Sequence, residues 1–312
     1  MRKVVECVPN FSEGRRREII DGIVAAMREV PGAQVLDVQS DVDHNRSVVT
    51  LVGEPQPIVE AAFRGIARAA ESIDMNHHRG GHPRMGATDV VPFVPVRGVS
   101  MEDCVVLARE LGQRVGDELG IPVYLYEEAA SRPDRRNLAD VRRGEYEGLK
   151  DEIGTDPERA PDFGPAVMGP AGATAIGARP ALIAFNVYLN TSNIAPAQAI
   201  ARAVRHSRGG LRYVKALGLV VEGQAQVSMN LTDYRHTPIH RVVEMIRSEA
   251  ARRGLSITRG EVVALLPAEA LVDAARFYLQ LDPFDGGLLS TSDAADDPLS
   301  VDLGGCRITN HK

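Results

Sequence analysis

The order of apolar patterns along the chain constrains its fold most strongly, because one succession of elements occurs twice. Strand-like runs and helical three-and-four spacings between residues 4 and 96 give the order β-α-β-β-α-β. The same order returns between residues 181 and 266. We therefore predict an α+β fold, an α/β sandwich built from two ferredoxin-like βαββαβ subdomains. We expect these subdomains to span residues 1–178 and 179–282, with a loosely held tail over residues 283–312.

The composition argues against several classes of protein. The chain has 312 residues, of which 44% are hydrophobic, so it is long enough for a large core. A net charge of -6, an aromatic content of 4% and the lack of Trp argue against a nucleic-acid-binding surface. The three cysteines lie far apart, which fits a reducing compartment better than a disulfide framework. Glu6 and Pro9 interrupt the apolar start and no later run reaches membrane-spanning length, so we expect a soluble, cytoplasmic protein.

The segment DMNHHRGGHPRMGATD, residues 74–89, carries the densest chemistry in the sequence. It follows a strongly periodic helical pattern and precedes an apolar run that is typical of a buried strand. Gly80, Gly81 and Pro83 prevent a helix from continuing through it. We therefore expect His82 on irregular backbone between two rigid elements, where catalytic groups are often found. Residues 74–89 are called the histidine loop below.

His82 is the strongest acid/base candidate in the histidine loop. An unperturbed imidazole titrates at about pH 6.5, so it can accept and return protons near neutrality. The alternative is an inert surface histidine, and the neighbouring Arg84 and Asp89 favour function. His77 and His78 are weaker candidates, because adjacent side chains point apart. His78 and His82 would need helical spacing to share a zinc ion, and the glycines between them prevent a helix, so zinc could bind only through the geometry of the loop. We therefore expect no metal site.

Arginines near this loop are candidates for binding the carboxylates of a substrate. Arg46, Arg79 and Arg84 have forked donors that match a carboxylate, and an acidic protein needs such local cations to attract an anion. The alternative is that they form ordinary surface ion pairs with Asp41, Asp43 or Asp89.

Two asparagines occupy corresponding places in the two halves. Asn10 and Asn186 each stand at or near the end of the first strand of their half. Their amides are candidates for binding a polar heterocycle from two sides, and turn formation is the alternative.

Three further segments give local expectations. Ser12 is expected to cap the first helix at its N-terminus. The charge-rich residues 127–153 are expected to form helical structure on the surface. The Gly- and Pro-rich residues 161–177 lack an apolar period and predict an ordered loop or a domain junction.

Several long motifs resemble one known family, the formiminotransferase domain. They are VECVPNFSEG, DHNRSVVTLVG, HHRGGHPRMGATDVVPFVPV, PDFGP and GATAIGAR, in this order. The resemblance covers essentially residues 1–280 and implies two βαββαβ subdomains with a tetrahydrofolate-binding passage between them, usually in a homodimer. In bifunctional members a cyclodeaminase domain follows, and we expect none within this chain.

The resemblance also implies roles for particular residues. The family's catalytic histidine lies in an HPRMG motif, which places it on His82. Folate contacts fall on one glycine-rich loop, here Gly164, Pro165, Ala166, Val167, Met168, Gly169, Pro170, Ala171 and Gly172. The chain departs from the pattern at Gln39, where some relatives carry an aspartate, and this loop is one residue shorter. Asp41 or Asp43 could replace that carboxylate.

The reaction implied by the resemblance is transfer of a formimino group from N-formimino-L-glutamate to N5 of tetrahydrofolate. One histidine can serve as base and then as acid, without a metal. From the chemistry alone we add Arg46 and Arg84 as ligands of the glutamate carboxylates and Asp89 as a partner of the amidinium. Two rival functions are a metal-dependent amidohydrolase and a non-catalytic module that binds folate or an amino acid.

Overall fold

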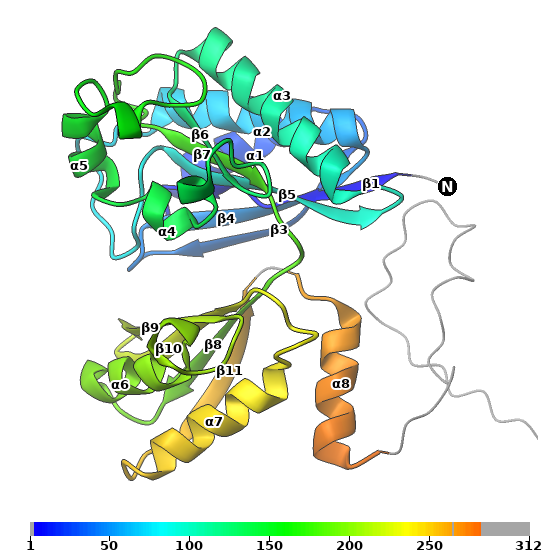
Figure 1. Cartoon of the computed structure of the whole chain (residues 1–312), viewed down its shortest axis with the longest axis vertical. Helices are drawn as coiled ribbons and strands as arrows, with labels where there is room; N and C mark the ends of the chain where they lie inside the picture. Colours follow the sequence, from blue (N-terminus) through cyan, green and yellow to red (C-terminus); the bar gives the residue numbers. More distant parts are fainter. Residues whose placement is uncertain (1–2, 264, 282–312) are drawn as a thin grey trace, which may run out of the picture.

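The computed structural model describes residues 3–263 and 265–281. They form two β-sheets, each with its own hydrophobic core and helices (Figure 1). The tail predicted over residues 283–312 lies outside the described residues. None of the helices described is long and apolar enough to cross a membrane.

The first half contains the predicted β-α-β-β-α-β order and extends it. Its strands are β1 (Val4–Cys7), β2 (Asn10–Phe11), β3 (Ala33–Asp41), β4 (Arg46–Gly53), β5 (Thr88–Arg97), β6 (Val123–Glu127) and β7 (Thr174–Ala178). Its long helices are α1 (Arg17–Arg28), α2 (Pro55–Ser72) and α3 (Met101–Leu119). β1 and β2 both pair with β4 and β5, so they act as one strand that is interrupted at Val8 and Pro9. β7 and β6 then extend the sheet from β5 in parallel.

The second half repeats the same order. Its elements are β8 (Ile183–Leu189), α6 (Ile194–Val204), the 3₁₀ helix η3 (His206–Arg208), β9 (Val214–Val221), β10 (Gln224–Leu231), α7 (Ile239–Ala251), β11 (Ile257–Val263) and α8 (Ala268–Leu279). The sheet order β11-β8-β10-β9, antiparallel throughout, is that of a ferredoxin-like unit. The last strand was predicted at 262–266, but it spans Ile257–Val263. The prediction missed its start because Thr258, Arg259 and Glu261 interrupt the apolar pattern. Helix α8 was not predicted.

The two sheets lie between two layers of helices. In Figure 1, α1, α2 and α3 cover the outer face of the first sheet, and α6 and α7 cover the outer face of the second. β4 is buried on both faces: Val49 and Leu51 belong to the first core, and Val48 and Thr50 on the other face are buried as well. The halves also contact each other directly, since the backbone N–H of Glu222 donates to Asp43 at 3.5 Å.

The segment between β6 and β7 is not the surface excursion that was predicted. It contains η1 (Pro133–Arg135), α4 (Leu138–Val141), α5 (Glu145–Glu152) and η2 (Pro157–Arg159). Val141, Tyr146 and Leu149 are buried in the first core. The N–H of Tyr146 donates to the carbonyl of Arg84 at 2.9 Å, so this stretch packs over the histidine loop. Residues 138–152 are called the covering segment below.

The N-terminus of α1 is stabilised differently from the prediction. Arg16 is the N-cap residue, and Oε1 of the buried Glu13 accepts from the N–H groups of Arg15 and Arg16 at 2.8 and 2.9 Å. Ser12 instead donates its hydroxyl to the carbonyl of Gly86 at 2.7 Å. A carboxylate at a helix N-terminus suits the helix dipole, which explains why Glu13 takes this role.

Backbone hydrogen bonds join the histidine loop to the glycine-rich loop 164–173. Met75 donates to Pro170 at 2.8 Å, Ala87 donates to Ala171 at 2.8 Å, and Ala173 donates to Met85 at 2.9 Å. Residues 84 to 95 positions apart in sequence are thereby held in one rigid unit.

We predict that Gly86→Ala destabilises this unit. A Cβ at residue 86 would lie 2.1 Å from the carbonyl oxygen of Ala173, and backbone on both sides limits relaxation. The free energy of unfolding, measured in urea, should fall by about 1–3 kcal/mol. Gly148→Ala is the control, because a Cβ there meets no atom within 4 Å. It lies within α5 and should leave stability equal or up to about 1 kcal/mol higher. Equal stability of Gly86→Ala and the wild type would contradict the prediction.

Candidate active site

The histidine loop forms part of a small, strongly polar pocket. Its lining residues come from four parts of the first half: Ser12, His44, Asn45, Arg46, His78, His82, Arg84 and Asp89. These side chains almost close the pocket, because about 170 Å³ of space between atoms remains, part of it open to solvent, and none of it holds a sphere the size of water. Sites for whole ligands usually enclose about 300–1,000 Å³, so a group of a substrate enters this pocket only when lining side chains move.

His82 is held in its neutral form. Arg46 Nη1 lies 2.5 Å from His82 Nε2. A guanidinium can only donate, so Nε2 accepts and the imidazole proton resides on Nδ1. Burial lowers the pKa of His82 to about 2, and Arg46, Arg142 and His44 add to the effect. The expected titration near neutrality is therefore wrong for the unliganded pocket, although the neutral ring is the form that can act as a base.

Asp89 and Arg142 form a buried ion pair beside this histidine. Oδ2 of Asp89 contacts the guanidinium of Arg142, and Oδ1 accepts the N–H of Met85 at 3.1 Å. Asp89 is only 1% exposed, and this burial raises its pKa. Sequence reasoning missed Arg142, because a single arginine in a charge-rich stretch carries no signal of its partner.

The guanidinium of Arg84 is bound by side chains of the protein itself. Its Nη1 lies 2.7 Å from Glu145 and its Nη2 lies 2.6 Å from Glu147. Its Nε donates to Nδ1 of His78 at 3.3 Å. The predicted alternative of an ion pair therefore holds in kind, with glutamates of the covering segment in place of the aspartates considered. The predicted role of Arg84 in binding a substrate stays a prediction.

The other two histidines of the loop are separated from each other. His78 is buried and contacts the carbonyl of Asn45 through Nε2 at 3.0 Å, and burial lowers its pKa. The side chain of His77 is 85% exposed and faces Asp74. Among the described residues no cluster of three or more His, Cys, Asp or Glu side chains is arranged to hold a metal ion.

The two asparagines do not occupy corresponding places. Asn10 lies in β2, just after the break in the first strand, and donates to the carbonyl of Val8 at 2.9 Å. Asn186 lies in the middle of β8 and donates to Glu261 at 3.0 Å, where the hydroxyl of Tyr188 also donates at 2.9 Å. Neither asparagine lines the His82 pocket.

The glycine-rich loop lies beside the pocket without lining it. Gly164 and Gly172 have φ values of +78° and +72°, which only glycine adopts readily. Met168 is buried, whereas Val167 is 69% exposed. The hydrogen bonds to Met75 and Ala87 nevertheless fix this loop against the histidine loop.

Gln39 and the two possible substitutes for an aspartate lie along one hairpin. The Gln39 amide donates to Asp37 at 2.8 Å. Asp41 lies 3.1 Å from Nδ1 of His44, and the hydrogen bond from His44 lowers the pKa of Asp41 to about 2. Asp43 is exposed. Asp41 is therefore the substitute that reaches the pocket, through His44.

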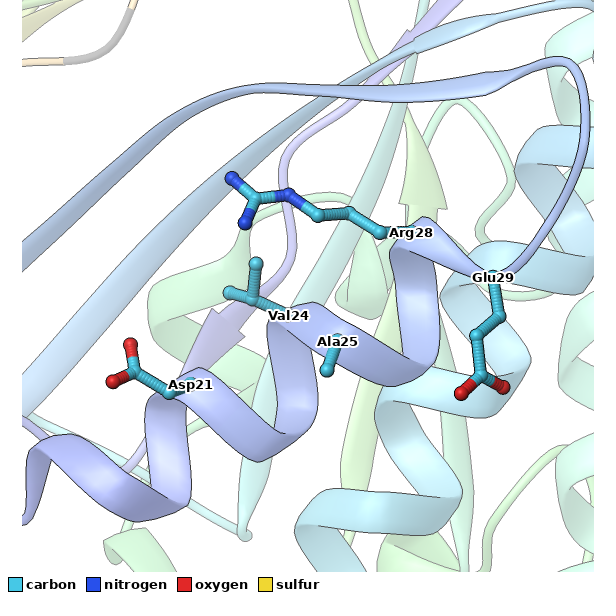
Figure 2. Close-up of a pocket in the computed structure, with 5 residues that line it drawn as sticks. All are labelled: Asp21, Val24, Ala25, Arg28 and Glu29. Atoms are coloured by element: carbon cyan, nitrogen blue, oxygen red, sulfur yellow. The ribbon is translucent and has the colours of Figure 1, made fainter.

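A second hollow lies on the surface of α1 and offers no comparable chemistry. Figure 2 shows the residues that line it, four on this helix and the last at its C-cap: Asp21, Val24, Ala25, Arg28 and Glu29. A row of side chains along one helix does not converge on a ligand from several directions, so the His82 pocket is the candidate site.

A histidine, an aspartate and arginines gathered in one pocket of a two-part α+β protein are typical of enzymes that carry out acid/base chemistry on small molecules. Two family models identify it more closely. The model described as "Formiminotransferase domain, N-terminal subdomain" matches residues 4–179, and "Formiminotransferase domain" matches residues 184–284. The chain belongs to the formiminotransferase domain family.

Curated relatives agree with this assignment. The chain is 54% identical over 288 residues to a glutamate formimidoyltransferase of Thermoplasma acidophilum. This match covers 91% of this chain and 95% of that protein. A glutamate formimidoyltransferase of Streptococcus pyogenes is 49% identical over 91% of this chain and 96% of its own length. The mouse formimidoyltransferase-cyclodeaminase is 47% identical, but the match spans 89% of this chain and 53% of that protein.

We predict that His82 stays neutral in the unliganded protein well below pH 6.5. Its lowered pKa means that the unfolded chain binds a proton that the folded chain does not, so stability is full above about pH 6.5 and is lost as pH falls below it. The loss from this group can reach about 1.4 kcal/mol per pH unit and should disappear in His82→Asn. Urea unfolding at pH 7 and 5, with NMR titration of the ring nitrogens, measures both effects. A His82 midpoint near pH 6.5 would refute this.

Proposed function

We propose that this chain transfers the formimino group of N-formimino-L-glutamate to N5 of tetrahydrofolate, giving 5-formiminotetrahydrofolate and L-glutamate. The observation that carries the proposal is the match of both halves to the formiminotransferase domain, with about half of all residues identical to glutamate formimidoyltransferases of nearly the same length.

The pocket supports the chemistry of this transfer. N5 attacks the amidine carbon and must lose a proton, and the departing glutamate nitrogen must gain one. The neutral imidazole of His82 is the proton acceptor, and the imidazolium so formed returns the proton to the leaving nitrogen. Asp89, on the wall of the same pocket, favours the cationic amidinium and the developing imidazolium. Holding the two reactants together supplies about 7 kcal/mol in favourable cases.

The folate site is proposed to involve both halves. The glycine-rich loop 164–172 would contact the folate, with Asn10 on the first sheet and Asn186 on the second contributing amides. Residues 1–178 and 179–282 are the proposed subdomains, with the folate passage between them. A homodimer in the cytoplasm, with tetrahydrofolate as co-substrate and no metal, completes the proposal and follows the resemblance to the family.

The decisive experiment measures glutamate release by the purified chain. L-Glutamate should appear from formiminoglutamate only when tetrahydrofolate is present. His82→Ala should lower kcat by roughly a hundred- to ten-thousandfold, with little change in tetrahydrofolate affinity, because a positioned acid/base contributes that much. Folate-independent release that a chelator abolishes would favour an amidohydrolase. Folate or amino-acid binding without turnover would favour the non-catalytic module.

We also predict that Val167→Asp weakens tetrahydrofolate binding. Val167 exposes a large apolar side chain on a loop that is fixed beside the pocket, and a charge there opposes contact with aromatic rings. KM for tetrahydrofolate should rise roughly fivefold or more, which corresponds to about 1 kcal/mol. The matched control is Val106→Asp, which alters a valine of similar exposure, 62%, on α3. Equal KM values for the two variants would remove Val167 from the folate site.

A further inference from the structure

The His82 pocket contains a partly buried guanidinium, that of Arg46, without a matching carboxylate. Among the described residues Arg46 forms no ion pair, and its recorded side-chain partner is the neutral ring of His82. Burial lowers the pKa of Arg46 to about 10, and the charge of Arg142 contributes next. An arginine so disfavoured in its charged form indicates that an anion is missing from its surroundings.

Two polar atoms in or next to this pocket lack a hydrogen-bond partner. They are Nδ1 of His82, which lines the pocket, and Nε of Arg142, which pairs with the lining residue Asp89; both are buried, and neither has a partner among the described residues. Both atoms are donors in the protonation states derived above. Buried donors are normally satisfied, so the pocket has unused capacity for an acceptor.

The other charges that face Arg46 do not supply this acceptor. Asp89, from β5, is already bound to Arg142 and to the N–H of Met85. Asp41, from β3, is held by His44. On the remaining side, Arg84 is occupied by two glutamates of the covering segment.

We propose that Arg46 and Arg142 together bind a carboxylate of the amino-acid donor, and that this carboxylate draws Arg46 away from His82. This inference rests on the proposed function, in which the donor is a formiminoglutamate. The carboxylate accepts from both guanidinium groups, which are suited to bind it through paired hydrogen bonds. The lining side chains almost close the pocket, so the carboxylate enters as Arg46 moves away from His82, and the space is far too small for a pteridine ring with its side chain.

Binding of this carboxylate enables His82 to act as the base. Nε2 of His82 loses the Arg46 hydrogen bond, so its lone pair becomes available to take the proton from N5 of the folate. The negative charge also offsets Arg46 and Arg142, two of the groups that hold the pKa of His82 down. His82 is thereby activated only when the donor is in place, and Arg142 is a binding residue that acts on catalysis through Arg46.

The test uses L-glutamate, the proposed product, as the probe for the full-length protein. Equilibrium dialysis with labelled glutamate gives its Kd without any turnover. Arg142→Gln should raise the Kd for glutamate and the KM for formiminoglutamate roughly ten- to a hundredfold, as expected for losing a charged hydrogen-bonding partner. The Kd for tetrahydrofolate should change less than about twofold. Arg142→Lys, which keeps the charge, should recover part of the affinity.

Two further variants guard against a general loss of structure. Arg142→Gln combined with Asp89→Asn removes both charges of the pair, so no uncompensated carboxylate stays buried, and it should show the same loss of glutamate affinity. Arg135→Gln is the matched control: Arg135 is buried and bound to Asp162 at 2.6 Å, outside the pocket. It should bind glutamate like the wild type. Circular dichroism and urea unfolding establish that each variant is folded.

NMR supplies a readout that a merely structural role would not change. Saturating glutamate should raise the pH midpoint of His82 in the wild type but not in Arg142→Gln. The proposal is overturned if folded Arg142→Gln and the double variant bind glutamate as tightly as the wild type. It is also overturned if these variants lose affinity for tetrahydrofolate instead of glutamate, because the arginines would then bind a carboxylate of the folate. If the wild type binds glutamate through Arg142 but transfers no formimino group, the proposed function fails and the carboxylate site stands.

Discussion

The buried contact between Asp89 and Arg142 is the interaction on which the site depends. Asp89 is the second residue of β5, and its carboxylate joins the N–H of Met85 in the histidine loop to Arg142, the C-cap residue of α4 in the covering segment. Because the pair is almost completely buried, losing one partner alone would leave an uncompensated charge, at a cost of about 3–5 kcal/mol. The same pair places a second guanidinium near His82, so one contact sets both the geometry and the electrostatics of the pocket.

The fold was largely predictable because its signals are local. Helical and alternating apolar periods gave two βαββαβ units, and both sheets have the ferredoxin-like order. The failures occurred where tertiary contacts, rather than local pattern, decide the structure. Residues 127–153 are rich in charge and yet bury Tyr146 and Leu149 against the histidine loop. β11 has few apolar residues and forms because β8 offers it a free edge.

The sequence predicted the central residues of the candidate site, but not the partners that surround them. A glycine-broken loop with His82 and Asp89 signals chemistry in the sequence alone. The partners of Arg84 and Asp89, by contrast, lie 53 to 63 residues away in the covering segment, and no spacing rule connects them. The sequence could not predict the protonation state of His82, because that state depends on burial and on Arg46 and Arg142, which folding brings close to the ring.

The second half influences the pocket although all the residues lining it belong to the first. The turn between β3 and β4 carries His44 and Asn45, and Asp43 in this turn accepts a hydrogen bond from Glu222, between β9 and β10. Glu222 in turn pairs with Arg259 at 3.0 Å, and that guanidinium stacks on the ring of Tyr188. Tyr188 and Asn186 share the carboxylate of Glu261. A continuous set of polar contacts therefore runs from the second sheet to the rim of the pocket. In the proposed function, a folate that contacts the second sheet would act on this set and, through the turn at Asp43, on His44 beside His82.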